Sequence, residues 1–413
     1  MRAVQPLSLA QILLYSVANL GANLVFGFAN FAFPLFLGAY AVPNLVVGLL
    51  AQERSLVGSF VQPLVGAVSD RLRPNRLGRR RPFFLVGVPL TALALLFLST
   101  HPPLWAVVTV LTVFSFVLAV ANDPYLALMP DIVPPEQRGR VGGVMAVFTA
   151  LGAVGAIAIS FLFWEKDQAL VFRLVALGLV VPFAITFFAV REPRVVPAPA
   201  PKGNGRLAVG PYVRDLLARR ELLKYLAATF CFWMGNGGIT PFVTRFGVHV
   251  LGVEENVSFL LVLPAIAGAA VFAVPAGLLT ERYGKKRVLA MGLLMFGLAA
   301  FVGAQLVRSV PEALVLMSIV GIANAITTAL IFPQLADIIP RERAGEFSGI
   351  GALVWSLAQP IGAVGAGAMA DATGTMRGAF ATGGAAMLLG FAILLTVRIT
   401  PHAAVAATEP AAG

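Results

Sequence analysis

Three ionisable residues stand inside stretches that are otherwise apolar enough to lie in a membrane: Glu53, Arg54 and Asp123. A charged side chain at the middle of a bilayer costs roughly 2.5–3.5 kcal/mol on insertion scales, so each of them needs a reason to be there. A carboxyl group can exchange a proton, and a guanidinium can tune a nearby carboxyl or hold a substrate oxygen. We therefore expect Glu53 and Asp123 to be candidates for proton coupling, with Arg54 as a partner. The alternative for Glu53 and Arg54 is a structural bridge to a neighbouring helix.

Amide and aromatic side chains within the apolar stretches form a second group. An amide offers donors and an acceptor that match vicinal hydroxyls, and an aromatic ring can stack on the apolar face of a sugar ring. This chemistry suits a sugar, and the alternative for each asparagine is a hydrogen bond between helices. The candidates for substrate binding are Asn23, Gln52, Asn122, Tyr125, Trp233, Asn236, Asn324, Trp355 and Gln359.

The elements that position these residues are long apolar segments. Of the 413 residues, 59% are hydrophobic and 12% are charged, whereas soluble domains hold roughly 25% charged residues. A bilayer core of roughly 30 Å needs about 20 helical residues. That length gives twelve expected helices, at residues 9–37, 43–69, 83–100, 104–128, 141–164, 168–190, 223–250, 256–279, 288–306, 311–336, 346–370 and 376–399. The fold class is therefore an all-α membrane protein with twelve transmembrane helices.

The helical rise gives the depth of the charged residues. Pro43 suits the first turn of its helix, and Glu53 follows ten residues later, roughly 15 Å into the membrane. Because adjacent helical positions point about 100° apart, Glu53 and Arg54 need not pair with each other. We also expect Pro124 to interrupt the fourth helix, and Gly235–Gly238 with Pro241 to break the seventh.

The basic residues predict the orientation. If both termini are cytoplasmic, 24 of the 30 Lys and Arg residues fall on the cytoplasmic side, as the positive-inside rule requires. This clustering explains the net charge of +11 without a nucleic-acid partner. One cysteine and three scattered histidines give no metal site, and no phosphate-binding loop or nucleophile–base set indicates an enzyme. We expect no cofactor.

An internal repeat divides the chain into two halves. Residues 131–136 (DIVPPE) match residues 337–342 (DIIPRE), and residues 78–81 (GRRR) match residues 284–287 (GKKR), both at an offset of 206. Six helices per half make this a parallel repeat, which is typical of two-domain transporters. The expected domains are six-helix bundles at 1–190 and 223–400, a cytoplasmic linker with an amphipathic helix at 191–222, and a disordered tail at 401–413.

Charged residues at the cytoplasmic ends of the helices form a candidate gate. A latch between the two halves would close the cytoplasmic mouth in one state and open it in the other. The alternative is that these charges only set the topology. The candidate gate residues are Gly66, Asp70, Arg71, Arg79, Arg80, Asp131, Glu281, Arg282, Lys285 and Asp337.

The repeat, the twelve helices and the sequence G-x-x-x-D-R…G-R-R-R after the second helix resemble the major facilitator superfamily over essentially the whole chain. The long loop that ends in GRRRPF, with Gln62-Pro63 ahead of Ser69-Asp70-Arg71, resembles the sucrose-type branch of the glycoside–pentoside–hexuronide:cation symporters. The resemblance implies that the first, fourth, seventh and tenth helices line a cavity, so that Asn23, Asn122, Asn236 and Asn324 face it. Gln62 and Asn122 occupy positions that are acidic in sodium-coupled, melibiose-type relatives, which favours protons, or no coupling ion, over sodium.

We therefore expect a monomeric secondary transporter of the inner membrane that moves a small-molecule solute, a sugar or glycoside, by alternating access with protons. One alternative is a proton-coupled exporter of drugs or amphipathic metabolites. The export branches of the superfamily often carry a glycine–proline motif in the fifth helix, and residues 141–164 contain no proline. A second alternative is a non-transporting membrane sensor built on a transporter fold.

Overall fold

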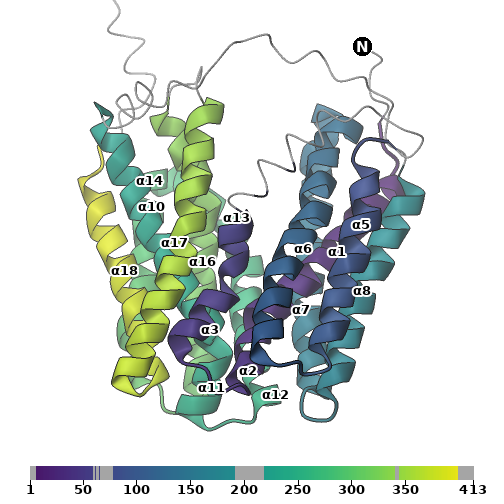
Figure 1. Ribbon diagram of the computed structural model, residues 1–413. Coiled ribbons are helices and arrows are strands. Elements are labelled where there is room, and N and C mark those ends of the chain that lie inside the picture. The colour runs from purple at the N-terminus through teal and green to yellow at the C-terminus, as the bar shows by residue number, and fades with distance from the viewer. Residues whose placement is uncertain are drawn as a thin grey trace, which may run out of the picture. The chain divides into compact units, whose positions relative to one another are not determined.

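The computed structural model describes residues 6–58, 61, 65, 78–190, 218–339 and 344–398, except for the side chains of 273–274 and 344–348. The regular elements of these residues are helices (Figure 1). Ten helical segments are long and apolar enough to cross a membrane. The other two predicted helices are residues 43–69, which lie partly outside the described residues, and residues 223–250, which are broken. The all-α membrane fold is confirmed.

Apart from the second predicted helix, the helices of the first half follow the predicted ranges closely. Short 3-10 turns or bends separate some of them. Their bounds are α1 Leu9–Phe31, α2 Phe33–Gly38, α3 Asn44–Ala51, α5 Arg81–Leu98, α6 Leu104–Ile132, α7 Arg138–Phe163 and α8 Gln168–Ala189.

The second half has more interruptions, including a π-helical turn at Ala299–Gly303 between α14 and α15. Its helices are α10 Arg220–Ile239, α11 Val243–Leu251, α12 Glu255–Ser258, α13 Leu263–Tyr283, α14 Lys285–Leu298, α15 Ala304–Leu306, α16 Val310–Ile338, α17 Ala344–Thr373 and α18 Met376–Thr396.

The chain forms two compact units. Unit 1 comprises Met1–Lys202 with Thr240–Ile266, and unit 2 comprises Gly203–Ile239 with Ala267–Gly413. The segment Thr240–Ile266 belongs to the second half by sequence but packs with the first. Within unit 1, Thr244 Oγ1 donates to the Phe31 carbonyl at 2.9 Å, and Trp164 Nε1 donates to Glu255 Oε2 at 2.7 Å. The boundary between the units therefore crosses the seventh and eighth helices.

One of the two predicted helix breaks is present in the structure. The predicted break in the seventh helix is confirmed, because the 3-10 turn Thr240–Phe242 separates α10 from α11. The predicted interruption at Pro124 is wrong, since α6 runs through it. A proline removes a single backbone hydrogen bond, and packing against neighbouring helices holds the turn together. A break that was not predicted ends α3 at Gln52, directly before Glu53.

The repeat is visible in backbone geometry and in hydrogen bonding. Gly78 and Gly284 both have positive φ angles, +96° and +81°, which glycine adopts without steric cost. The Tyr15 hydroxyl donates to the Tyr125 carbonyl at 3.1 Å, and the Tyr225 hydroxyl donates to the Ile331 carbonyl at 2.5 Å. The two acceptors are 206 residues apart, so the first and fourth helices of each half are joined at the same level.

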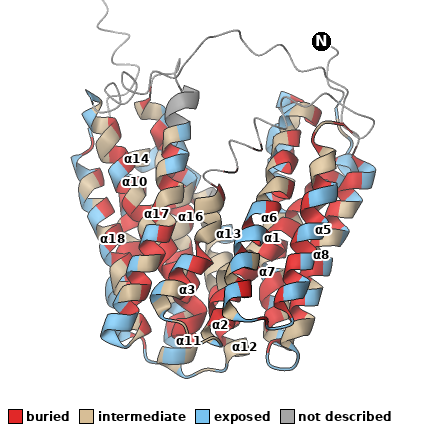
Figure 2. Cartoon of the chain, viewed as in Figure 1, coloured by how far each residue is buried: buried red, intermediate tan, exposed pale blue. Residues whose placement is uncertain are grey.

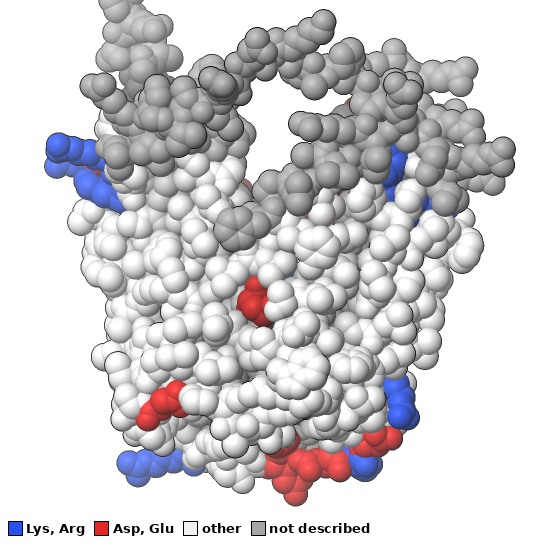
Figure 3. All heavy atoms as spheres, viewed as in Figure 1, with Lys and Arg blue, Asp and Glu red and all other residues white. Residues whose placement is uncertain are grey.

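Buried and exposed faces alternate along most helices (Figure 2). Many exposed residues are large and apolar, including Phe188, which is 79% exposed, and Trp105, which is 73% exposed. The face shown in Figure 3 has few charged groups between the two ends of the helices. Such apolar surfaces are expected where lipid covers a protein.

Candidate functional site

Glu53 and Arg54 resume the second helix after the break at Gln52, and they contact different neighbours. A Glu53 carboxylate oxygen accepts a hydrogen bond from Ser115 Oγ of α6. Arg54 Nη2 donates to Asn30 Oδ1 of α1 at 3.0 Å, and its guanidinium carbon lies 4.7 Å from the Phe26 ring centroid. The expectation that Glu53 and Arg54 need not pair is confirmed: the described residues show no ion pair between them. The two residues connect the second helix to the fourth and the first.

Asp123 is a carboxyl group within the membrane-spanning helix α6, and its charge is poorly compensated. Asn122 precedes it in the sequence, and the Asp123 Oδ2 atom is buried without a hydrogen-bond partner among the described residues. A buried carboxylate without a cation pays several kcal/mol in desolvation, which protonation avoids. Glu53, in contrast, has a hydroxyl donor and is followed directly by the Arg54 guanidinium. The charge of Glu53 is therefore better compensated than the charge of Asp123.

The amides of α1 bond to the neighbouring helix α7. Asn23 Nδ2 donates to the Asn19 carbonyl at 2.8 Å and to Thr149 Oγ1 at 3.4 Å, and Asn19 Nδ2 donates to the Met145 carbonyl at 2.9 Å. For Asn23 the structural alternative, a hydrogen bond between helices, is thus present. Its side chain remains half-buried.

Three other candidates in the first half are more fully enclosed. Gln52 is 3% exposed and accepts a hydrogen bond from Ser55 Oγ at 3.3 Å, and Asn122 is 8% exposed. Tyr125 has no exposed surface: its hydroxyl donates to the Tyr15 carbonyl at 3.2 Å, and its ring packs on Phe183. A ring enclosed on both faces has no surface to offer a sugar, so Tyr125 is a core residue in this structure.

In unit 2 the candidates gather around α10. Asn236 Nδ2 donates to Asn324 Oδ1 of α16 at 3.1 Å, and both side chains are half-buried. Trp233 lies one helical turn before Asn236, and its buried Nε1 has no hydrogen-bond partner among the described residues. A pair of amides and an indole N–H group without a hydrogen-bond partner among the described residues therefore occur together.

Trp355 and Gln359 lie on α17, which packs closely against α10. Trp355 is 4% exposed, and its Nε1 donates to Thr229 Oγ1 at 2.9 Å. The Gln359 carbonyl would lie 2.4 Å from a Cβ atom on Gly237, so the two helix backbones are in contact. Trp355 connects the helices, whereas the Gln359 side chain is half-buried.

The charged helix ends form ion pairs inside each unit. Asp131 Oδ2 lies 2.8 Å from Arg79 Nη2 and 2.9 Å from Arg80 Nε, and Asp337 Oδ2 lies 2.7 Å from Lys285 Nζ. The two aspartates are 206 residues apart, so the repeat extends to these pairs. Glu281 and Arg282 are exposed. Gly66, Asp70 and Arg71 lie outside the described residues, and a latch between the halves remains a prediction.

The two ion pairs should contribute unequally to stability. The side chains around Asp131 are 6% to 21% exposed, whereas those of Lys285 and Asp337 are 40% and 41% exposed. We expect Asp131→Asn to lower the free energy of unfolding by about 2 kcal/mol, because two partly buried guanidinium groups lose a carboxylate partner. Asp337→Asn should cost about 0.5 kcal/mol, as exposed pairs do. Unfolding of both variants in the same detergent measures the difference, and equal losses would contradict this interpretation.

Sequence reasoning missed several residues of the site. Asn30, Phe26 and Ser115 hold the two charged residues of the second helix, and Asn19 supports Asn23. A signal was available on α1, because Asn19, Asn23, Phe26 and Asn30 recur at spacings of three and four and so share one helix face. For Ser115 the sequence has no comparable pattern.

The parallel repeat, the membrane-spanning helices and the polar groups in their middle together define a two-domain membrane transporter. The sequence model of the Major Facilitator Superfamily matches residues 15–270 and again residues 255–412. The chain therefore belongs to the major facilitator superfamily. It is a multi-pass membrane protein and a secondary transporter that works by alternating access.

Relatives of this chain include transporters of different cargo. An uncharacterised MFS-type transporter of Methanocaldococcus jannaschii is 21% identical over 71% of this chain and 71% of its own. Proton-associated sugar transporter A of Mus musculus is 31% identical over 32% of this chain and 20% of its own. Sucrose transport protein SUC4 of Arabidopsis thaliana is 28% identical over 37% of this chain and 34% of its own. Multidrug resistance protein MdtG of Dickeya zeae is 24% identical over 52% of this chain and 54% of its own.

The fold also matches solved structures. A peptide transporter POT in complex with sulfate superimposes with a TM-score of 0.75 at 13% sequence identity, covering 94% of each chain. At this identity the likeness concerns the fold alone.

Proposed function

We propose that this protein is a proton-coupled symporter that carries a sugar or glycoside across the inner membrane, as a member of the sucrose-type branch. The observation that carries the sugar proposal is the Asn236–Asn324 amide pair with Trp233 one turn away. Amides and indole N–H groups are suited to hydroxyl groups, and the indole ring to the apolar face of a sugar. Arg54, held by Asn30 and Phe26 in unit 1, is proposed separately as the partner of the coupling carboxyl groups.

Asp123 is the proposed proton carrier. Its partner-free oxygen favours a protonated carboxyl in this state, and a solute hydroxyl or a water chain would stabilise the charged form in another. Glu53 is the second candidate, since its carboxylate is already held by Ser115. The partial similarity to a proton-associated sugar transporter supports the combination of sugar and proton.

The second candidate function is export of an amphipathic drug or metabolite. The similarity to a multidrug resistance protein favours it, because that match covers more of the chain than the sugar transporter matches do. The amide pair counts against it, since drug sites are usually richer in aromatic residues than in amides.

Tryptophan fluorescence tests the sugar site. Addition of the bound sugar, found in a panel of monosaccharides and disaccharides, is expected to change the emission of wild-type protein but not of Trp233→Phe. Trp105→Phe is the matched control, because Trp105 is 73% exposed and should leave the response intact. A response that survives in Trp233→Phe, or one evoked only by amphipathic cations, would contradict the proposal.

A further inference from the structure

Helix α1 carries two asparagines whose amide groups are fixed in opposite directions. Asn23 Nδ2 donates to the Asn19 carbonyl at 2.8 Å, and Asn30 Oδ1 accepts from Arg54 Nη2 at 3.0 Å. A carbonyl oxygen can only accept and a guanidinium can only donate, so neither amide can turn around without losing its partner. The atoms left over are therefore the oxygen of Asn23 and the NH₂ group of Asn30.

Both of these remaining atoms are open to a solute. Among the described residues, neither Asn23 Oδ1 nor Asn30 Nδ2 has a hydrogen-bond partner. The two side chains are half-buried, and neither atom is fully enclosed. One helix therefore offers an acceptor at one level and a donor at another.

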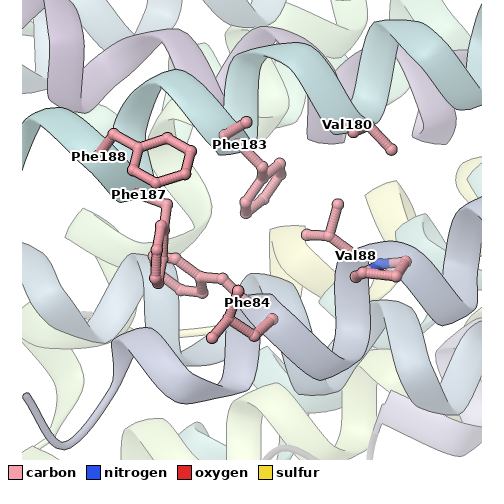
Figure 4. Close-up of a pocket in the computed structure, with 9 residues that line it drawn as sticks. Phe84, Val88, Val180, Phe183, Phe187 and Phe188 are labelled. Carbon is pink, nitrogen blue, oxygen red and sulfur yellow. The ribbon is translucent and has the colours of Figure 1, made fainter. Parts of the chain in front are cut away.

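The surface of α1 that carries these atoms differs from the lipid-facing surface of unit 1. Between α5 and α8, an apolar groove is lined by nine residues, none of them polar, and Phe188 at its edge is 79% exposed (Figure 4). In contrast, α1 has no exposed residue from Tyr15 to Phe31, and its half-buried positions include Asn23, Phe26 and Asn30. A stripe of amides with a guanidinium beside it is unfavourable against lipid and suits a solute pathway.

The spacing of the two open atoms fits one sugar ring. Asn23 and Asn30 are seven residues apart, which corresponds to roughly 10 Å along a helix. Hydrogen bonds of about 2.8 Å at both ends leave about 5 Å between the two solute oxygens. Oxygens 1 and 4 of a pyranose ring lie at opposite ends of the ring and have this separation, whereas neighbouring hydroxyl groups are too close together.

We propose, on the basis of the proposed sugar transport, that α1 binds one pyranoside ring end to end. The 4-hydroxyl group donates to Asn23 Oδ1, and the glycosidic oxygen accepts from Asn30 Nδ2. A glycosidic oxygen carries no proton and can only accept, so it matches the amide whose oxygen is held by Arg54. Asn23 and Asn30 thus select a glycoside by the direction of its hydrogen bonds.

Derivatives at position 4 test the Asn23 end. Tryptophan emission of the full-length protein measures the affinity for methyl glucoside, methyl galactoside and methyl mannoside, and for the 4-deoxy and 4-deoxy-4-fluoro derivatives of those that bind. Because fluorine cannot donate, wild type should bind both derivatives about tenfold more weakly than the parent glycoside. Asn23→Leu, which has no acceptor, should bind all three about equally.

Asn30→Asp tests the other end. Its carboxylate still accepts from Arg54 but cannot donate to a glycosidic oxygen, whereas the 1-hydroxyl group of a free sugar can donate to it. Wild type should bind the methyl glycoside and the free sugar about equally, and Asn30→Asp should prefer the free sugar about tenfold. Asn256→Asp is the matched control, because Asn256 lies on α12 and its Oδ1 accepts from the Val257 N–H at 2.7 Å. It should behave as wild type does.

Several outcomes would overturn the proposal. Equal affinity of wild type for the parent and the fluoro derivative would exclude the 4-hydroxyl contact and leave sugar transport untouched. An unchanged preference in Asn30→Asp would mean that Asn30 only holds Arg54. If a disaccharide binds but none of the three glycosides does, the ring site on α1 fails alone. If no sugar binds at all, the proposed function fails with it.

Discussion

Replacing Asp123 by asparagine is expected to abolish uphill transport while leaving exchange of solute intact. If one proton accompanies each solute, a gradient of one pH unit supplies about 1.4 kcal/mol, enough for an accumulation of about tenfold. An amide cannot carry the proton, so accumulation by Asp123→Asn should vanish. Counterflow of labelled solute, which needs no proton gradient, should persist because the amide resembles the protonated carboxyl in shape.

Glu53→Gln is the control for this prediction. The glutamine carbonyl can still accept the hydrogen bond from Ser115, so this variant should keep most of the accumulation. If Glu53→Gln abolishes accumulation and Asp123→Asn does not, the assignments of the two residues are reversed. If both variants accumulate solute, the protein is not coupled to protons through either carboxyl group.

The second large effect is expected at Gly362, where α17 crosses α10. A Cβ atom at Gly362 would lie 1.7 Å from the Met234 carbonyl oxygen, far inside contact distance. Because the obstacle is backbone, the helices must separate, so Gly362→Ala should lower the free energy of unfolding by about 3 kcal/mol. The thermal unfolding midpoint in detergent, with the monodisperse yield, measures this loss.

Gly365→Ala is the matched control, one turn further along the same helix. A Cβ atom there meets nothing within 4 Å, and alanine favours a helix over glycine by up to about 1 kcal/mol. Gly365→Ala should therefore be as stable as wild type or slightly more stable. Equal midpoints for Gly362→Ala and wild type would show that the two helices do not pack as closely as described.

The helices could be predicted well from the sequence because their length and hydropathy are imposed by the bilayer. The repeat could be predicted equally well. Gly78 and Gly284 both adopt a backbone conformation that other residues avoid. Asp131 and Asp337, at the same offset, both form ion pairs with basic side chains. These features depend on local chemistry or on spacing, which a sequence displays directly.

Contacts between side chains of different helices were harder to predict from the sequence. The hydrogen-bond partner of Arg54 is Asn30, 24 residues away, and which asparagine it meets depends on how two helices rotate against each other. The helix break at Gln52 has no glycine or proline beside it and so could not be predicted. Pro124 led us to predict a break, but packing keeps α6 continuous there. Tyr125 was predicted to stack on a sugar ring, but it has no exposed surface, and its hydroxyl donates to the Tyr15 carbonyl in the core.

Proton flux in proteoliposomes tests the proposed function most directly. Purified protein is reconstituted in vesicles with an internal pH dye, and monosaccharides, disaccharides and amphipathic cations are added one at a time without a preset gradient. A sugar-proton symporter should acidify the vesicle interior when its sugar is added, and the signal should vanish in Asp123→Asn. No response to any sugar, with proton movement on adding amphipathic cations instead, would contradict the sugar symporter and establish the exporter.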